Sequence, residues 1–207
     1  MNLVMMGIQG CGKGTQAELL EQHFGWRHIN IGNLFRSNIE RQTELGKEAS
    51  KYTEKGELVP DELVYEVIKD AIRKADKGLI LDGFPRNLAQ HEFLVENVKI
   101  DKVFLLDLDT ETAIKRISSR RHCENCKRDY NLLYNKPKEK GVCDDCGGNL
   151  VQRKDDNEEA VALRIEKFYQ ETGKVIDLYR KQNKLISINA DQGIQEIHRQ
   201  ILAELSC

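Results

Sequence analysis

The residues best suited to chemistry form a glycine-rich run near the start of the chain. Residues 7–15 read GIQGCGKGT, follow an apolar segment and precede a helical pattern. Glycines let the backbone come close to a phosphate group, and the N–H groups of such a loop and helix attract the anion. A lysine and a hydroxyl then suit the β- and γ-phosphates and a magnesium ion. The run predicts a P-loop whose nucleotide ligands are Gly10, Cys11, Gly12, Lys13, Gly14 and Thr15.

Four of the six cysteines form two C-x-x-C pairs. Cys123 and Cys126 are separated from Cys143 and Cys146 by sixteen residues. This spacing is typical of a Cys₄ zinc ribbon, in which four thiolates close a tetrahedral site and leave no position for catalysis. We therefore expect structural Zn²⁺. Disulfides and metal-free thiols are the alternative interpretations.

A second group of polar residues surrounds the sequence LDGFPR at 81–86. Asp82 ends an apolar run, where an acid can bind the water shell of magnesium. Arg86 can bind a phosphate through two parallel hydrogen bonds. Gln90 offers both a donor and an acceptor, which suits the edge of adenine. The alternative is a plain turn with a surface arginine.

The elements that must position these residues alternate between strands and helices. Short apolar runs predict buried strands at 3–6, 27–31, 78–82, 103–107 and 184–189. Helical patterns occupy 15–24, 111–121, 157–181 and 195–205. A further helix is predicted to begin after Asp61, which would be its N-cap. Such alternation predicts an α/β fold with a parallel sheet of five strands.

Two segments interrupt this alternation. Residues 30–59 predict short charged helices, and residues 119–156 hold turn residues, aromatics and the cysteines. We expect a core domain formed by residues 1–29, 60–118 and 157–207, a small helical lobe at 30–59, and a zinc-binding lid at 119–156.

With these motifs, the chain resembles the adenylate kinase family over nearly its full length. The resemblance rests on residues 7–17, 29–36, 56–64, 81–90, 116–121 and 153–164, and the cysteine quartet is similar to that of the zinc-containing, long-lid members. It implies a P-loop parallel sheet flanked by helices, with a lobe for the nucleoside monophosphate and a zinc-ribbon lid. It also implies reversible transfer of a phosphoryl group from Mg²⁺-ATP to AMP to give two ADP, by a monomer.

The resemblance also implies roles for individual residues. Arg116 would stack on the adenine of ATP, and Tyr130, which matches a lid aromatic of the zinc-type members, would also bind ATP. The residues implied in catalysis are Lys13, Arg86, Arg120, Arg153 and Arg164. Those implied in AMP binding are Gly32, Arg36, Glu57, Leu58, Val59, Gly83, Phe84, Pro85, Arg86, Gln90, Arg153 and Arg164. Arg120 would also bind ATP, and magnesium would be held by Thr15 and, through water, by Asp82.

Two details of this region are read from the residues themselves. Arg116 and Arg120 lie four positions apart in a predicted helix and would share one face. Asp155 and Asp156 precede the charged helix, and we expect them to act as its caps.

The chain departs from the family in one motif. The family usually has Ser-Thr-Gly-Asp where residues 30–33 read NIGN. This change leaves open a preference for UMP, CMP or GMP over AMP, although Gln90 and the long lid favour AMP.

Composition limits the other classes of function. The 207 residues carry a net charge of −2, which gives no overall attraction to nucleic acid. A zinc-ribbon module that binds nucleic acid through Lys127, Arg128, Tyr130 and Tyr134 is the alternative from another class. Residues 135–138 read NKPK and lack the aspartate of the guanine-reading signature, which argues against a GTPase. No apolar run approaches the ~20 residues of a membrane span, and no signal peptide is evident, so we expect a cytoplasmic protein without membrane or nucleic-acid partners.

Overall fold

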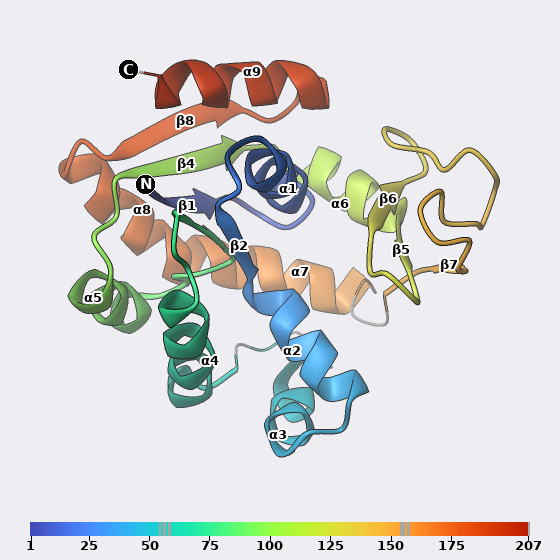
Figure 1. The fold of residues 1–207 in the computed structure, drawn as a ribbon, viewed down its shortest axis with the longest axis horizontal. Coiled ribbons are helices and arrows are strands. Elements are labelled where there is room, and N and C mark those ends of the chain that lie inside the picture. The colour runs from blue at the N-terminus through green and yellow to red at the C-terminus, as the bar shows by residue number, and fades with distance from the viewer. Residues whose placement is uncertain (54, 56, 58, 154–155, 157, 207) are drawn as a thin grey trace.

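The computed structural model describes residues 1–53, 55, 57, 59–153, 156 and 158–206. Its centre is a parallel sheet of five strands in the order β2-β3-β1-β4-β8 (Figure 1). The strands are β1 (Asn2–Met6), β2 (Arg27–Asn30), β3 (Leu79–Asp82), β4 (Lys102–Asp107) and β8 (Leu185–Asn189). The predicted α/β class and the five-stranded sheet are therefore confirmed.

Helices cover both faces of this sheet. Successive strand residues alternate between two buried clusters: Leu3 and Met5 belong to one, and Val4 and Met6 to the other. The Leu3 cluster includes side chains from α1 (Lys13–Phe24), α6 (Thr110–Ser118) and α9 (Ile194–Leu205). The Val4 cluster includes side chains from α4 (Asp61–Arg73), α5 (Leu88–Asn97) and α8 (Gly173–Lys181). The inner strands β1, β3 and β4 are largely buried on both faces, which explains their mainly apolar sequences, whereas the edge strands β2 and β8 are partly exposed.

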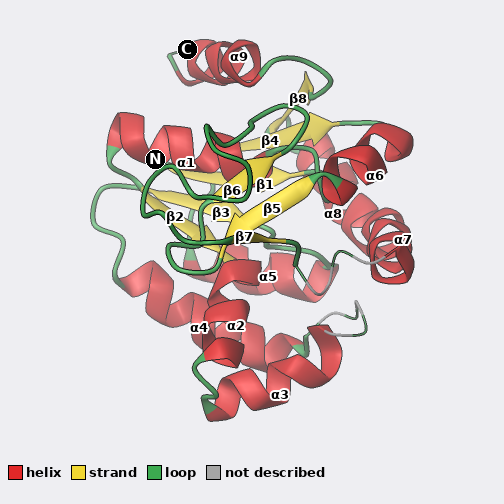
Figure 2. Ribbon diagram, turned by 90° about the vertical axis from the view of Figure 1, so that its right-hand side faces the viewer, coloured by secondary structure: helices red, strands yellow, loops and turns green. Residues whose placement is uncertain are grey.

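Two segments leave the sheet. Helices α2 (Ile31–Glu40) and α3 (Glu44–Thr53) pack against each other beside α4, and a Cβ on Gly46 would collide with the backbone of Asn38. Strands β5 (Arg120–Cys123), β6 (Asp129–Asn131) and β7 (Leu150–Val151) form a separate antiparallel sheet in the order β6-β5-β7 (Figure 2). We refer to residues 119–153 as the lid. The domain boundaries given above stay a prediction.

The predicted helix at 111–121 is wrong at its end, because α6 stops at Ser118. The hydroxyls of Ser118 and Ser119 donate to the carbonyls of Ile114 and Lys115, a local bonding mode that weakens a helix end. The chain then pairs as β5, so Arg120 lies on a strand. Arg116 and Arg120 therefore do not share a helix face.

Other element ends also differ from expectation. Pro60, not Asp61, is the N-cap of α4, and the Asp61 carboxylate instead accepts from Asn87 Nδ2 and Gln90 Nε2. Strand β2 ends at Asn30, and Ile31 already begins α2. The charged helix predicted at 157–181 is divided into α7 (Glu158–Lys167), a π-helical segment (Phe168–Thr172) and α8.

Within the described part of the chain, no helix has both the length and the apolar character to traverse a lipid bilayer.

Candidate functional site

The glycine-rich loop connects the central strand β1 to helix α1, and its glycines are required by the backbone. Gly7, Gly10 and Gly12 have φ angles of 139°, 84° and 97°, in the left-handed region that favours glycine. A Cβ on Gly7 would lie 2.5 Å from the carbonyl oxygen of Leu106, and one on Gly10 would lie 2.8 Å from that of Ala113. The loop therefore lies tightly against β4 and α6 and opens the N-terminus of α1, as an anion-binding loop requires.

Lys13 folds back over this loop. Its Nζ donates to the carbonyl oxygens of Gly7 at 2.8 Å and Ile8 at 2.9 Å, and lies 3.5 Å from Cys11 Sγ. The side chain of Cys11 is fully buried and fills the space under the loop. The ammonium group is thus kept at the anion-binding face by two carbonyl groups that a phosphate can replace.

Asp82 lies beside the same loop at the carboxyl end of β3. It pairs in parallel register with Met5 of β1 and Asn30 of β2. Burial alone would raise the pKa of this carboxyl. The hydrogen bond to His28 and the positive charges of Lys13 and His28 outweigh burial, so the pKa lies below its usual value. The carboxylate is therefore ionised in its buried position, which fits a ligand of the water shell of magnesium.

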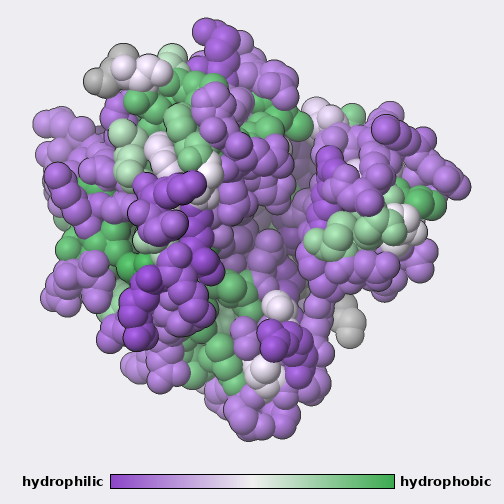
Figure 3. Space-filling view, viewed as in Figure 1, coloured by the Kyte–Doolittle hydropathy of each residue, from purple (hydrophilic) through white to green (hydrophobic). Residues whose placement is uncertain are grey.

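A cavity of about 980 Å³ lies between α2, the lid and the loop after β3. Figure 3 shows the molecule hollowed between the lid and the rest of the chain, with hydrophilic surface on both sides. Of the residues predicted to bind the monophosphate or the transferred phosphoryl group, the cavity is lined by Gly32, Arg36, Glu57, Val59, Gly83, Arg86, Gln90, Arg120, Arg153 and Arg164. Leu58 lies outside the described residues. Phe84 belongs to the Val4 cluster beneath the cavity, and Pro85 is buried in the adjoining loop.

Cationic groups dominate this cavity. Arg86 Nε donates to the carbonyl oxygen of Gly83 at 2.8 Å, and burial together with the charge of Arg164 lowers the pKa of Arg86. Two guanidinium groups this close repel each other, and an anion bound between them would offset the repulsion. The predicted arginines therefore converge although the chain supplies them from four separate segments.

The lid arginines are oriented by carboxylates. Asp156 accepts from Arg120 through both carboxylate oxygens, Oδ2 lying 2.9 Å from Nε. Asp129 accepts from Arg153 Nη2 at 2.6 Å. Asp156 thus forms an ion pair, its predicted capping role stays a prediction, and Asp155 lies outside the described residues.

Gln90 lines the cavity with its amide already engaged. Its Oε1 accepts from the backbone N–H of Arg86 at 2.8 Å, and its Nε2 donates to Asp61 Oδ1 at 2.7 Å. Reading of a base edge by this amide stays a prediction, and it requires exchange of the bond to Asp61.

Arg116 and Tyr130 lie away from this cavity. The Arg116 guanidinium donates to the carbonyl oxygen of Ala190 at 3.0 Å and lies 4.9 Å from the ring centre of Tyr134. Tyr130 is buried against the cysteines, with 2% of its surface exposed. The aromatic ring beside Arg116 in this structure is therefore Tyr134. A role of Tyr130 in ATP binding stays a prediction.

Several cavity residues were missed in the sequence. His122 of β5 and Glu124, just after its end, line it, and with Arg120 they occupy every second position. Since side chains alternate across a strand, and Cys123 faces the buried cysteine cluster, this period of two was the available signal. Gln9 and Lys127 also line the cavity. Lys127 Nζ lies 2.9 Å from Glu40 Oε1, so it joins the lid to α2.

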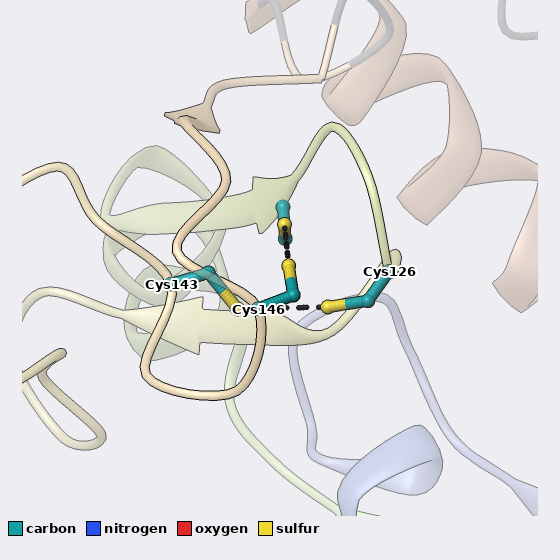
Figure 4. A group of neighbouring side chains, drawn as sticks. Cys126, Cys143 and Cys146 are labelled. Carbon is teal, nitrogen blue, oxygen red and sulfur yellow. Dashed lines mark hydrogen bonds between the residues drawn. The ribbon is translucent and has the colours of Figure 1, made fainter.

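The four paired cysteines lie together in the lid (Figure 4). Their sulfur atoms all lie within 4.8 Å of one another, with Cys123–Cys146 at 3.4 Å and Cys126–Cys143 at 3.5 Å. Four ligands at a Zn–S distance of about 2.3 Å would be ~3.8 Å apart, so the cluster fits tetrahedral zinc.

Tyr130 supports the cluster from one side. Its hydroxyl accepts from the backbone N–H of Asp144 at 2.7 Å and lies 3.4 Å from Cys143 Sγ, to which it can donate. This hydrogen bond, together with backbone N–H groups of Asp145 and Cys146, lowers the pKa of Cys143 to about 6. A thiolate is the form that binds a metal, so the neighbours of Cys143 favour metal binding.

Comparison with known proteins adds independent findings. A family model described as adenylate kinase matches residues 5–184. The chain is 42% identical to an adenylate kinase of Acetivibrio thermocellus, with 100% of this chain and 98% of the relative covered. It is also 42% identical to adenylate kinases of Caldicellulosiruptor bescii (99% of each chain covered) and of Bacillus licheniformis (97% and 96% covered).

Proposed function

Because the chain belongs to the adenylate kinase family, we propose that it transfers the terminal phosphoryl group of Mg²⁺-ATP to AMP, giving two ADP, and that it also catalyses the reverse reaction. The observation that carries the proposal is the arrangement of the two sites. A glycine-rich loop with Lys13 ends the central strand, Asp82 ends the neighbouring strand, and an arginine-lined cavity lies next to them.

The residues present define the steps. ATP binds with its phosphates on the N–H groups of residues 10–15. Thr15 and, through water, Asp82 would hold the Mg²⁺ that accompanies ATP, which would neutralise phosphate charge. AMP binds in the cavity, where Arg36 and Arg86 hold its phosphate. Arg120, Arg153 and Arg164 then stabilise the charge that spreads over the transferred group. The AMP phosphate is itself the nucleophile, so no covalent enzyme intermediate is needed.

The lid excludes water from this reaction. It reaches α2 through the Lys127–Glu40 ion pair, and its Arg120 and Arg153 are oriented toward the cavity by carboxylates. Exclusion of water matters because a site open to solvent would hydrolyse ATP. The four cysteines would hold a zinc ion that crosslinks the lid. We further propose that the protein is a monomer of the cytoplasm, where paired cysteines favour metal over disulfide.

The substrate test is a coupled assay of ADP formation from Mg²⁺-ATP with AMP, CMP, UMP and GMP in parallel. We expect turnover with AMP to exceed that with the others by about 10²-fold or more, because an adenine-reading site leaves polar groups unpaired against other bases. The second candidate, another nucleoside monophosphate kinase, is favoured by the NIGN sequence at 30–33. A preference for CMP, UMP or GMP would establish it and would overturn the assignment to AMP.

Binding of nucleic acid by the lid has less support. Lys127 pairs with Glu40, Arg128 with Asp145, and Tyr130 is buried. The side chains proposed to contact bases and phosphates are thus largely engaged within the protein.

Arg86→Ala tests the monophosphate site. We expect kcat/KM for AMP to fall by about 10²–10⁴-fold, because each charge-assisted hydrogen bond to phosphate contributes about 1.5–3 kcal/mol and Arg86 can form two. The KM for ATP should change little. Steady-state kinetics with each substrate varied in turn gives both values. Arg73→Ala, an exposed arginine at the end of α4, is the matched control. A value for Arg86→Ala within threefold of the parent would remove Arg86 from the site.

A further inference from the structure

Asn30 forms two hydrogen bonds in two directions. It is the last residue of β2 and the N-cap of α2. Its Oδ1 accepts from the backbone N–H of Asn33 at 2.8 Å, and its Nδ2 donates to Asp82 Oδ2 at 2.5 Å. The orientation of the amide is determined by its partners, because an ionised carboxylate only accepts and a backbone N–H only donates.

The Asp82 bond lies at the edge of the phosphate loop. Asn30 and Asp82 are opposite each other in parallel register on β2 and β3. A Cβ on Gly14 would lie 3.5 Å from Asp82 Oδ2 and 4.0 Å from Asn30 Nδ2. The third group at this carboxylate is His28, whose Nε2 lies 3.5 Å from the same oxygen. The Asn30 amide thus restrains a carboxylate that borders the triphosphate site.

The other bond lies at the edge of the cavity. Asn30 caps the first turn of α2, which carries Ile31 and Gly32 in the cavity wall. One turn further, Asn33 Oδ1 accepts from Arg36 Nη2 at 2.5 Å. A continuous series of hydrogen bonds therefore runs from Asp82 through Asn30 and Asn33 to Arg36.

We propose that Asn30 is a positioning residue that orients Asp82 toward the triphosphate site with its amide nitrogen and fixes the monophosphate-binding turn of α2 with its amide oxygen. The inference rests on the function proposed above. It requires both groups of one amide: aspartate would keep the cap but lose the donor, and alanine would lose both.

Two variants separate the two bonds. Asn30→Asp retains a strong N-cap but places a second carboxylate against Asp82. We expect its kcat to fall roughly tenfold or more, in proportion to a lost charge-assisted bond, with KM for AMP within about twofold of the parent. Asn30→Ala should show the same fall in kcat and, because the cap is also lost, a rise of about threefold or more in KM for AMP.

The controls are Asn97→Asp and Asn97→Ala, in an exposed asparagine at the end of α5. Both should match the parent in kcat and KM. Melting temperatures are measured for all variants, since a merely structural role would lower them without altering the division between kcat and KM.

The outcomes are distinct. Unchanged kcat in Asn30→Asp overturns the role toward Asp82, and unchanged KM for AMP in Asn30→Ala overturns the role toward α2. Parent protein without any turnover of ATP and AMP would instead reject the proposed function. Parent activity with variants that lose only thermal stability rejects the inference alone.

Discussion

Lys13→Ala will lower kcat for ATP and AMP by about 10³–10⁵-fold, the range found for the strongest cationic contacts to a transferring phosphoryl group. In the structure its ammonium group donates to two carbonyl oxygens of the phosphate loop, at 2.8 and 2.9 Å. These neutral acceptors keep the ammonium group at the phosphate loop. When ATP binds, phosphate oxygens can replace the carbonyl oxygens as its hydrogen-bond partners. Steady-state kinetics with saturating AMP will show the loss in kcat.

A second substitution separates charge from loop geometry. Lys13→Gln keeps a donor for the loop carbonyls but carries no charge, so we expect it to be nearly as inactive as Lys13→Ala. The matched control is Lys115→Ala, at a lysine of α6 that forms an exposed pair with Glu111. Activity of Lys13→Gln within tenfold of the parent would show that the charge of Lys13 is not needed.

Removal of zinc is expected to unfold the lid while the central sheet persists. The described part of the lid has a very small apolar core, formed by Cys123, Tyr130 and Cys143 with Leu150 packed against them. Structural zinc contributes about 10–16 kcal/mol to the folding of small domains, far more than such a core can supply. The five-stranded central sheet has its own two buried clusters, so we expect it to stay folded without the lid.

The measurement combines metal content, stability and activity. Elemental analysis should find one zinc per chain, and chelation should abolish ADP formation while most of the far-ultraviolet circular dichroism remains. Cys143→Ser should lose zinc and activity together, whereas Cys207→Ser, outside the quartet, should retain both. A chelated protein free of zinc yet equal to the parent in activity and melting temperature would contradict the structural role of the metal.

The sheet was predictable because each strand is encoded locally. Its inner strands are largely buried on both faces, so Leu3 to Met6 and Val103 to Leu106 are apolar without interruption. The end of α6 was not predictable in the same way. Arg120 and Arg121 are good helix formers, and only their pairing with β6 makes them a strand.

The candidate site likewise has a part that was predictable from the sequence and a part that was not. The phosphate loop is a contiguous motif, so its members could be named from the sequence. Gln9, His122 and Lys127 reach the cavity from different elements, and their proximity arises only when the lid lies over α2. The packing of Tyr130 against the cysteines was not predictable either, because the sequence does not show which of the lid aromatics buries them.

The π-helical segment Phe168–Thr172 has a consequence for how this enzyme tolerates insertions and deletions. A π-turn contains one residue more than an α-turn. Deletion of one residue here would restore a regular α-helix and turn α7 by about 100° relative to α8. Arg164 would then leave the cavity, while Thr172 could no longer donate to the carbonyl oxygen of Arg86 at 2.8 Å. The extra residue thus sets the rotation of α7, which carries Arg164, relative to α8, which packs on the sheet.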